Sequence, residues 1–221
     1  MNNKIFEDVD NYIANLLGQE DDVLQHVTIA NQEAGLPDIS ISSNQGKLLQ
    51  VFAMACGAKK ILELGTLGAY STIWLAKTLP QGGKLVTIEF DEHHAAVARK
   101  NIAYAKLGDI IDLRVGKALD ILPELVSANE APFDMIFIDA DKPPYTEYFQ
   151  YALQLSRPGT IIICDNVVRN GAVLDANSTD EKVRGVQRLN AFLSTCKEVT
   201  ATILQTVGVK EYDGMVVAVV K

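Results

Sequence analysis

The stretch ILELGTLGAYST, residues 61–72, decides how the rest of the chain is interpreted. Its first four residues are nearly all apolar, as expected of a strand that is buried on both faces of a parallel sheet. Gly65 and Gly68 then permit a tight turn, after which a helix is predicted to begin near residue 69. A strand, a glycine turn and a helix in this order form one βα unit of an α/β protein.

The same unit recurs along the chain after residue 59. Short apolar runs predict strands, and the amphipathic stretches between them predict helices. The predicted strands cover 59–65, 84–90, 110–116, 133–140 and 159–167, and the predicted helices cover 69–79, 92–106, 117–128 and 144–155. We therefore expect an α/β fold with a mostly parallel sheet and helices on both faces.

The two ends of the chain follow other patterns. Residues 200–207 and 215–220 predict a closing antiparallel hairpin, with a turn signal at Asp213 and Gly214. Residues 1–58 predict a helical appendage packed on the same domain. We expect a single domain over 1–221, whose α/β core spans 59–221.

Charge and composition exclude several classes of protein. The chain has 20 Lys and Arg residues and 28 Asp and Glu residues, which gives a net charge of −8. Binding of nucleic acid or of an anionic membrane surface needs basic patches, so neither is expected. The three cysteines are odd in number and show no CxxC spacing, which favours a reduced, cytoplasmic protein.

The glycine turn also predicts a nucleoside ligand at the end of the first strand. A dinucleotide fingerprint would need glycines in place of Leu67 and Tyr70, so a pyrophosphate would be poorly held. S-adenosylmethionine (SAM) fits better, with its ammonium group facing Glu63 and its carboxylate facing Ser71 or the loop amides. The alternative is an ordinary strand-to-helix turn.

The next two strand ends supply groups for the rest of that ligand. Glu89 lies 24 residues after Gly65, a spacing at which an acid commonly binds ribose hydroxyls. Asp91 competes for this role, although it falls at a helix start and is suited to capping it. Gly116 and Ala118 are small enough for an adenine ring to lie against the backbone.

Two further strand ends carry oxygen donors. Asp139, Asp165 and Asn166 offer only oxygen ligands, which suit Mg²⁺ and also Mn²⁺ or Ca²⁺, whereas zinc would need His or Cys. Asp141 and Lys142 follow on the same loop. The alternative is that these polar residues only cap strands at the rim of the sheet.

Taken together, the sequence resembles the cation-dependent, SAM-dependent O-methyltransferases of the caffeoyl-CoA and catechol O-methyltransferase group. Six stretches carry the resemblance in the family's order: ISSNQGKLL, ILELGTLGAYST, LVTIEFD, VGKALDIL, FIDADKPPY and ICDNVVRNG. The resemblance implies a Rossmann-like fold of seven strands, a small catechol-like or other ortho-diphenolic acceptor, and a homodimer.

The resemblance also implies roles for single residues. Asp139, Asp165 and Asn166 match the metal ligands, Lys142 matches the proposed general base, and Asn170 falls where plant members contact the phenolic substrate. Asp139 is also implied in catalysis. The implied SAM contacts are Ile41, Glu63, Gly65, Thr66, Ser71, Glu89, Ala118, Asp139 and Asp141.

The expected chemistry is methyl transfer to a hydroxyl group. A free phenol has a pKa of about 10, and a divalent cation would stabilise its anion at neutral pH. Lys142 is expected either to accept the proton or to stabilise the phenolate. Three other functions remain: a SAM-binding protein without turnover, a methyltransferase for another acceptor class, and, least favoured, a nicotinamide dehydrogenase.

Overall fold

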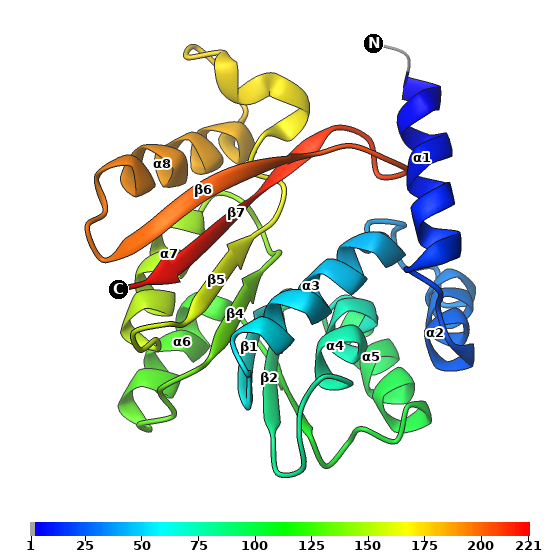
Figure 1. Ribbon diagram of the computed structural model, residues 1–221. Helices are drawn as coiled ribbons and strands as arrows, with labels where there is room; N and C mark the ends of the chain where they lie inside the picture. The colour runs from blue at the N-terminus through cyan, green and yellow to red at the C-terminus, as the bar shows by residue number, and fades with distance from the viewer. Residues whose placement is uncertain (1–2) are drawn as a thin grey trace.

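The computed structural model describes residues 3–221, which form one seven-stranded sheet in the order β3-β2-β1-β4-β5-β7-β6 (Figure 1). β1 to β5 pair in parallel, whereas β7 runs antiparallel to both β5 and β6. The strands are β1 Lys60–Leu64, β2 Lys84–Glu89, β3 Ile111–Val115, β4 Met135–Ile138, β5 Ile161–Cys164, β6 Val199–Thr206 and β7 Asp213–Val220. The predicted fold class, including the C-terminal hairpin, is confirmed.

Eight α-helices and one 3-10 helix surround this sheet in the described residues. They are α1 Asn3–Leu16, α2 Asp22–Glu33, α3 Ser43–Ala55, α4 Tyr70–Ala76, α5 Glu92–Tyr104, α6 Ala118–Ser127, α7 Tyr145–Gln154, η1 Arg169–Leu174 and α8 Glu181–Thr195. Asp91 caps α5 by accepting the amides of His93 and His94, so its predicted capping role is confirmed. None of the helices in this part of the chain is long and apolar enough to cross a membrane.

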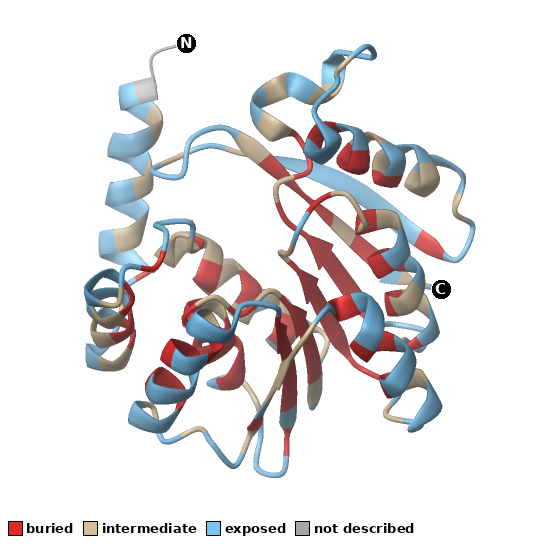
Figure 2. Ribbon diagram, turned by 180° about the vertical axis from the view of Figure 1, so that it is seen from behind, coloured by how far each residue is buried: buried red, intermediate tan, exposed pale blue. Residues whose placement is uncertain are grey.

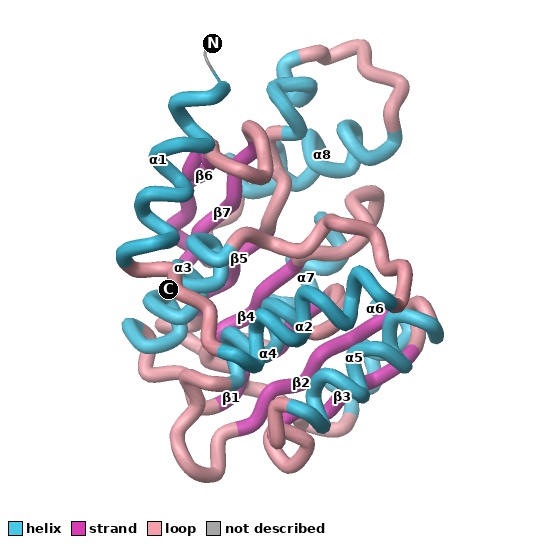
Figure 3. The backbone as a smooth tube through the Cα atoms, turned by 90° about the vertical axis from the view of Figure 1, so that its right-hand side faces the viewer, coloured by secondary structure: helices cyan, strands magenta, loops and turns pink. Residues whose placement is uncertain are grey.

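Alternate residues of the parallel strands belong to two separate apolar cores, one on each face of the sheet. Leu62 and Leu64 of β1 face the core that α6, α7 and α8 cover, whereas Ile61 faces the core built with α2 to α5. This period of two is what a strand buried on both sides requires. Figure 2 shows the buried strands at the centre of the molecule, and Figure 3 shows α2, α4 and α5 together on one face.

The N-terminal helices differ in how closely they pack against the sheet: α2 and α3 contribute to its core, whereas α1 does not. Leu24 and Val27 of α2 and Leu49 of α3 belong to the same core as the sheet. α1 lies farther out, where the tip of the β6–β7 hairpin reaches it (Figure 1). There the carboxylate of Asp10 accepts the amide of Val209 at 3.0 Å.

The predicted turn at Asp213 and Gly214 is wrong in position. Both residues already belong to β7, where Gly214 pairs with Gln205, and the turn lies over 207–212. A side-chain contact accounts for the difference, because the Asp213 carboxylate accepts the amides of Val168 and Arg169 and so ties the start of β7 to the chain after β5.

Candidate active site

A cavity of about 720 Å³ opens at the carboxyl ends of the parallel strands, where ligands bind in open α/β sheets. We call it the strand-end cavity. Eleven residues singled out from the sequence line it: Ile41, Gly65, Thr66, Ser71, Glu89, Gly116, Ala118, Asp139, Asp141, Lys142 and Asn166. Glu63, Asp165 and Asn170 do not line it.

Gly65 allows the first turn to pass close to β4. Its φ of +95° lies in the left-handed region, and a Cβ at this position would stand 2.1 Å from the carbonyl oxygen of Asp139. No L residue fits both constraints without moving the backbone. The glycine therefore lets the turn after β1 and the loop that follows β4 from Asp139 lie against each other in one wall of the cavity.

Glu89 organises the same turn from the neighbouring strand. Its Oε2 accepts the amides of Thr66 and Leu67 at 3.1 and 2.7 Å, and its Oε1 accepts the amide of Asp91 at 2.9 Å. The carboxylate is buried and still lines the cavity. It is therefore held rigidly in the position from which it was predicted to bind ribose hydroxyls.

Glu63 lies behind the cavity wall and is fully buried. Its carboxyl oxygens accept the hydroxyls of Ser71, Thr72 and Thr87. Burial raises the pKa of Glu63 to about 7, although these hydroxyl donors act in the opposite direction. Its connection to the cavity runs through Ser71, so direct contact with a SAM ammonium group stays a prediction.

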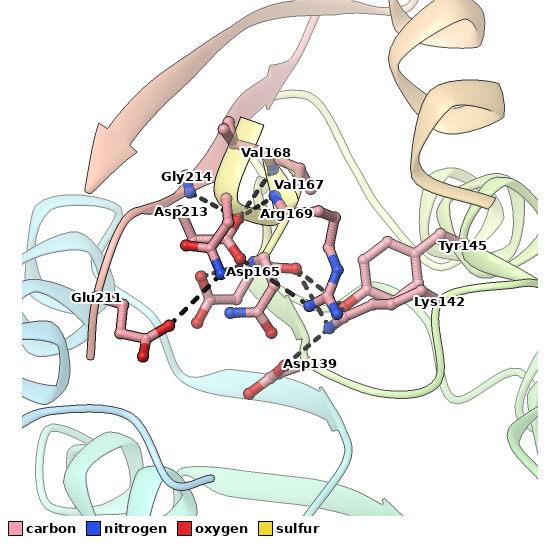
Figure 4. Close-up of polar contacts among 12 residues, drawn as sticks. Asp139, Lys142, Tyr145, Asp165, Val167, Val168, Arg169, Glu211, Asp213 and Gly214 are labelled. Carbon is pink, nitrogen blue, oxygen red and sulfur yellow. Dashed lines mark hydrogen bonds and ion pairs between the residues drawn. The ribbon is translucent and has the colours of Figure 1, made fainter. Parts of the chain in front are cut away.

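Lys142 is the buried cation of the site. Its Nζ donates to Asp139 Oδ1 at 3.1 Å, to the hydroxyl of Tyr145, and to the carbonyl oxygen of Asp165 at 3.4 Å (Figure 4). The Tyr145 hydroxyl in turn donates to the Asp165 carbonyl oxygen at 3.1 Å. Three acceptors around Nζ match the three protons of an ammonium group.

Asp165 and Asn166 follow β5, next to the end of β4. Ile138 and Cys164 are the last residues of β4 and β5, and they pair with each other. Asp139 and Asp165, which come next in the chain, therefore follow the ends of two adjacent strands. Burial raises the pKa of Asp165 to about 7, and the negative charge of Asp139 adds a smaller effect in the same direction. No group of three His, Cys, Asp or Glu side chains suited to a metal occurs within residues 3–221, so a site here needs the amide of Asn166 as a third donor.

Asn170 lies away from the cavity. Its side chain is exposed and donates to Glu211 at 3.4 Å, so its predicted contact with a substrate stays a prediction.

The structure adds lining residues that the sequence reasoning missed. These residues are Arg169 and Lys182, which bring two cations to the cavity. Arg169 stands three residues after Asn166, so its position in the motif was a usable signal. Lys182 had no such signal, because α8 reaches the site only through tertiary packing.

Comparisons with known proteins agree with this geometry. Residues 16–219 match the family model described as O-methyltransferase. The chain is 62% identical over 221 residues to a catechol O-methyltransferase from Niastella koreensis, with 100% of both chains covered.

Solved structures show the same likeness. An O-methyltransferase from Bacillus cereus in complex with SAH has a TM-score of 0.96 and 48% identity, covering 99% of this chain and 100% of that one. The O-methyltransferase TomG from Streptomyces achromogenes, involved in tomaymycin synthesis and solved with SAM, has a TM-score of 0.96 and 47% identity, covering 100% and 99%.

Proposed function

This chain belongs to the O-methyltransferase family and is a SAM-dependent enzyme, and from that premise we propose that it methylates a hydroxyl group of a catechol-like small molecule with the help of a divalent cation. One observation carries the proposal. Asp139, Lys142 and Asn166 line the same cavity as Gly65 and Glu89, so groups for acceptor chemistry and for a nucleoside meet in one space.

The nucleoside end of the cavity fits SAM. Glu89 offers a rigid carboxylate for ribose hydroxyls, while Gly116 and Ala118 leave room for a flat base. Ser71 stands beside the glycine turn with its hydroxyl oriented by Glu63. These residues would bind and orient the methyl donor.

The opposite end fits a hard divalent cation. Two carboxylates and one amide, Asp139, Asp165 and Asn166, come from adjacent strand ends and supply only oxygen donors. A cation would also relieve the repulsion between two carboxylates of which one is almost fully buried. Mg²⁺ is the ion we propose, and Mn²⁺ or Ca²⁺ have the same donor preference.

The chemistry needs an acceptor oxygen in its anionic form. When bound, the cation would supply positive charge that stabilises a phenolate whose proton leaves to water, and SAM would supply the methyl group as its S–CH3 bond breaks, leaving S-adenosylhomocysteine. Lys142 holds its proton at Nζ between Asp139 and Tyr145, and from there it stabilises negative charge on an oxygen that enters the cavity. Asp139 fixes the direction of Lys142, while the burial of Lys142 limits competition from water.

The decisive test removes the metal. The purified enzyme is assayed with SAM and a panel of catechols, caffeoyl esters and flavonoids, before and after EDTA treatment. We expect methylation of at least one ortho-diphenol, its loss in EDTA and its return with added Mg²⁺.

A variant at the metal site separates the alternatives. Asp165→Ala is expected to bind SAM and to lose methyl transfer at every Mg²⁺ concentration. Full activity of Asp165→Ala after EDTA would exclude the metal-assisted mechanism. Binding of SAM by the wild-type enzyme without methylation of any diphenol would favour another acceptor class or a binding protein.

A further inference from the structure

The strand-end cavity holds an arginine that the proposed reaction does not use. Four cations line the cavity, together with the carboxylates of Glu89, Asp139 and Asp141; the cations are Lys117, Lys142, Arg169 and Lys182. Lys142 is paired with Asp139. The guanidinium group of Arg169 has no carboxylate within hydrogen-bond distance in the described part of the chain, so it can take an anionic partner.

The backbone around Arg169 is built to hold this side chain in place. Arg169 has a φ of +55°, and Asn170 and Gly171 follow with +53° and +84°. Left-handed backbone is costly for residues with a side chain, and such strain persists only where neighbouring structure enforces it. Here Asp213 enforces it, since its Oδ1 accepts the amides of Val168 and Arg169, both at 2.9 Å.

The guanidinium group itself is poorly satisfied. Nε of Arg169 is buried and has no hydrogen-bond partner among residues 3–221. The Asp213 carboxylate lies 4.0 Å from Nη1, beyond a normal hydrogen bond, and its other oxygen already accepts the two loop amides. A guanidinium group that lacks acceptors is unfavourable, and a ligand in the cavity can supply acceptors to its two terminal amino groups.

We propose that the methyl acceptor carries a carboxylate group and that Arg169 is the specificity-determining residue that binds it, with Lys182 adding positive charge at the cavity. The inference rests on the proposed function and extends it from catechols in general to aromatic ortho-dihydroxy acids. A planar carboxylate matches the fork of an arginine and accepts two parallel hydrogen bonds. In Figure 4 the Arg169 side chain extends from its loop toward the Lys142 side of the site.

A matched pair of acceptors tests the proposal. 3,4-Dihydroxybenzoate and its methyl ester share the ring and the two hydroxyls and differ in charge. We measure kcat/KM for both with saturating SAM and Mg²⁺ in the wild-type enzyme and in Arg169→Met, which keeps an apolar stem and removes the guanidinium group. The wild-type preference for the acid is expected to fall about 10- to 100-fold, mainly through KM of the acid.

Two further variants control for structural effects. Arg169→Lys keeps the charge without the fork and is expected to retain part of the preference. Arg184→Met removes an exposed arginine that pairs with Glu181 outside the cavity, and it is expected to leave the preference unchanged.

Three results would overturn the inference. Arg169→Met could leave the acid-to-ester ratio unchanged, or lower both acceptors equally, which would indicate a structural role. It could instead weaken SAM binding measured by calorimetry without acceptor, which would place the guanidinium on the carboxylate of SAM. Methylation of both acceptors with an unchanged ratio contradicts this inference alone, whereas methylation of neither contradicts the proposed function as well.

Discussion

Glu63 shows how a single residue links the core to the site. Its carboxyl group lies fully buried at the end of β1 and holds the Ser71 hydroxyl, which lines the cavity. Burial disfavours the charged form, while three hydroxyl donors compensate only partly, so its pKa rises from 4.5 to about 7.

This shift makes the stability of the protein depend on pH. Between pH 4.5 and about 7 the folded state keeps a proton that the unfolded state has lost. The contribution of Glu63 to the free energy of unfolding is therefore fully present below pH 4.5 and is lost as the pH rises through about 7. Over this range the free energy of unfolding falls by up to about 1.4 kcal/mol per pH unit.

Glu63→Gln removes this titration and keeps a polar side chain for the hydroxyls. We expect the free energy of unfolding of the variant, relative to wild type, to rise by about 1–3 kcal/mol from about pH 5 to about pH 8. Urea unfolding at the two pH values measures it. The exposed Glu124→Gln should show no such change, and an equal difference at both pH values for Glu63→Gln would contradict the prediction.

At the scale of elements, the start of β7 determines the shape of the loop after β5. Asp213 is the first residue of β7, and its carboxylate receives two amides from that loop, while Val167 donates its amide to the carbonyl oxygen of Gly214 at 2.9 Å. The loop carries Asn166 and Arg169, so an antiparallel strand far along the chain positions both.

Removal of this anchor should therefore harm activity more than folding. We expect Asp213→Ala to lower kcat/KM for a catechol acceptor about tenfold or more, because the amides of Val168 and Arg169 lose the acceptor that holds Arg169 in the left-handed region. Stability should fall by only about 1–3 kcal/mol. Steady-state kinetics and hydrogen exchange over 166–171 measure these effects.

Asp213→Asn serves as the matched variant, because its amide oxygen can accept the same backbone donors. It should recover most of the activity and protection from exchange. Equal loss in both variants would show that the charge of Asp213, rather than its hydrogen bonds, is what the loop requires.

At the scale of the whole molecule, α1 presents an unusual surface. Ile5, Val9, Tyr12 and Leu16 repeat at helical spacing and are between 48% and 64% exposed. On α3, which α1 contacts, Val51 and Met54 are exposed at 55% and 72%. An apolar stripe of this kind is typical of a protein–protein contact, in keeping with the expected homodimer.

We predict a particle of twice the 24.1 kDa chain mass in light scattering after size-exclusion chromatography. Leu16→Lys should shift it toward the monomer, because a charge in an apolar interface must be desolvated. Glu7→Lys introduces the same residue elsewhere on α1 and should leave the mass unchanged. A monomeric wild-type protein at micromolar concentration would refute the prediction.

The sequence by itself determined the strands, the helices between the parallel strands and many of the residues that line the cavity, but not helix α8. Apolar runs such as Ile161–Cys164 predict buried strands, and glycine after β1 predicts a turn toward a ligand. These signals are local, and parallel strands place their carboxyl ends at one edge. Residues at those ends, such as Glu89 and Asp139, were therefore found without a structure.

Only the tertiary structure decided which residues complete the site. It placed Glu63 behind Ser71, turned Asn170 toward Glu211, and brought Arg169 and Lys182 to the cavity. The physical reason is that these positions depend on contacts between distant segments. Asp213 and Val168 are 45 residues apart and Val209 and Asp10 are 199 residues apart, so no local sequence pattern encodes either contact.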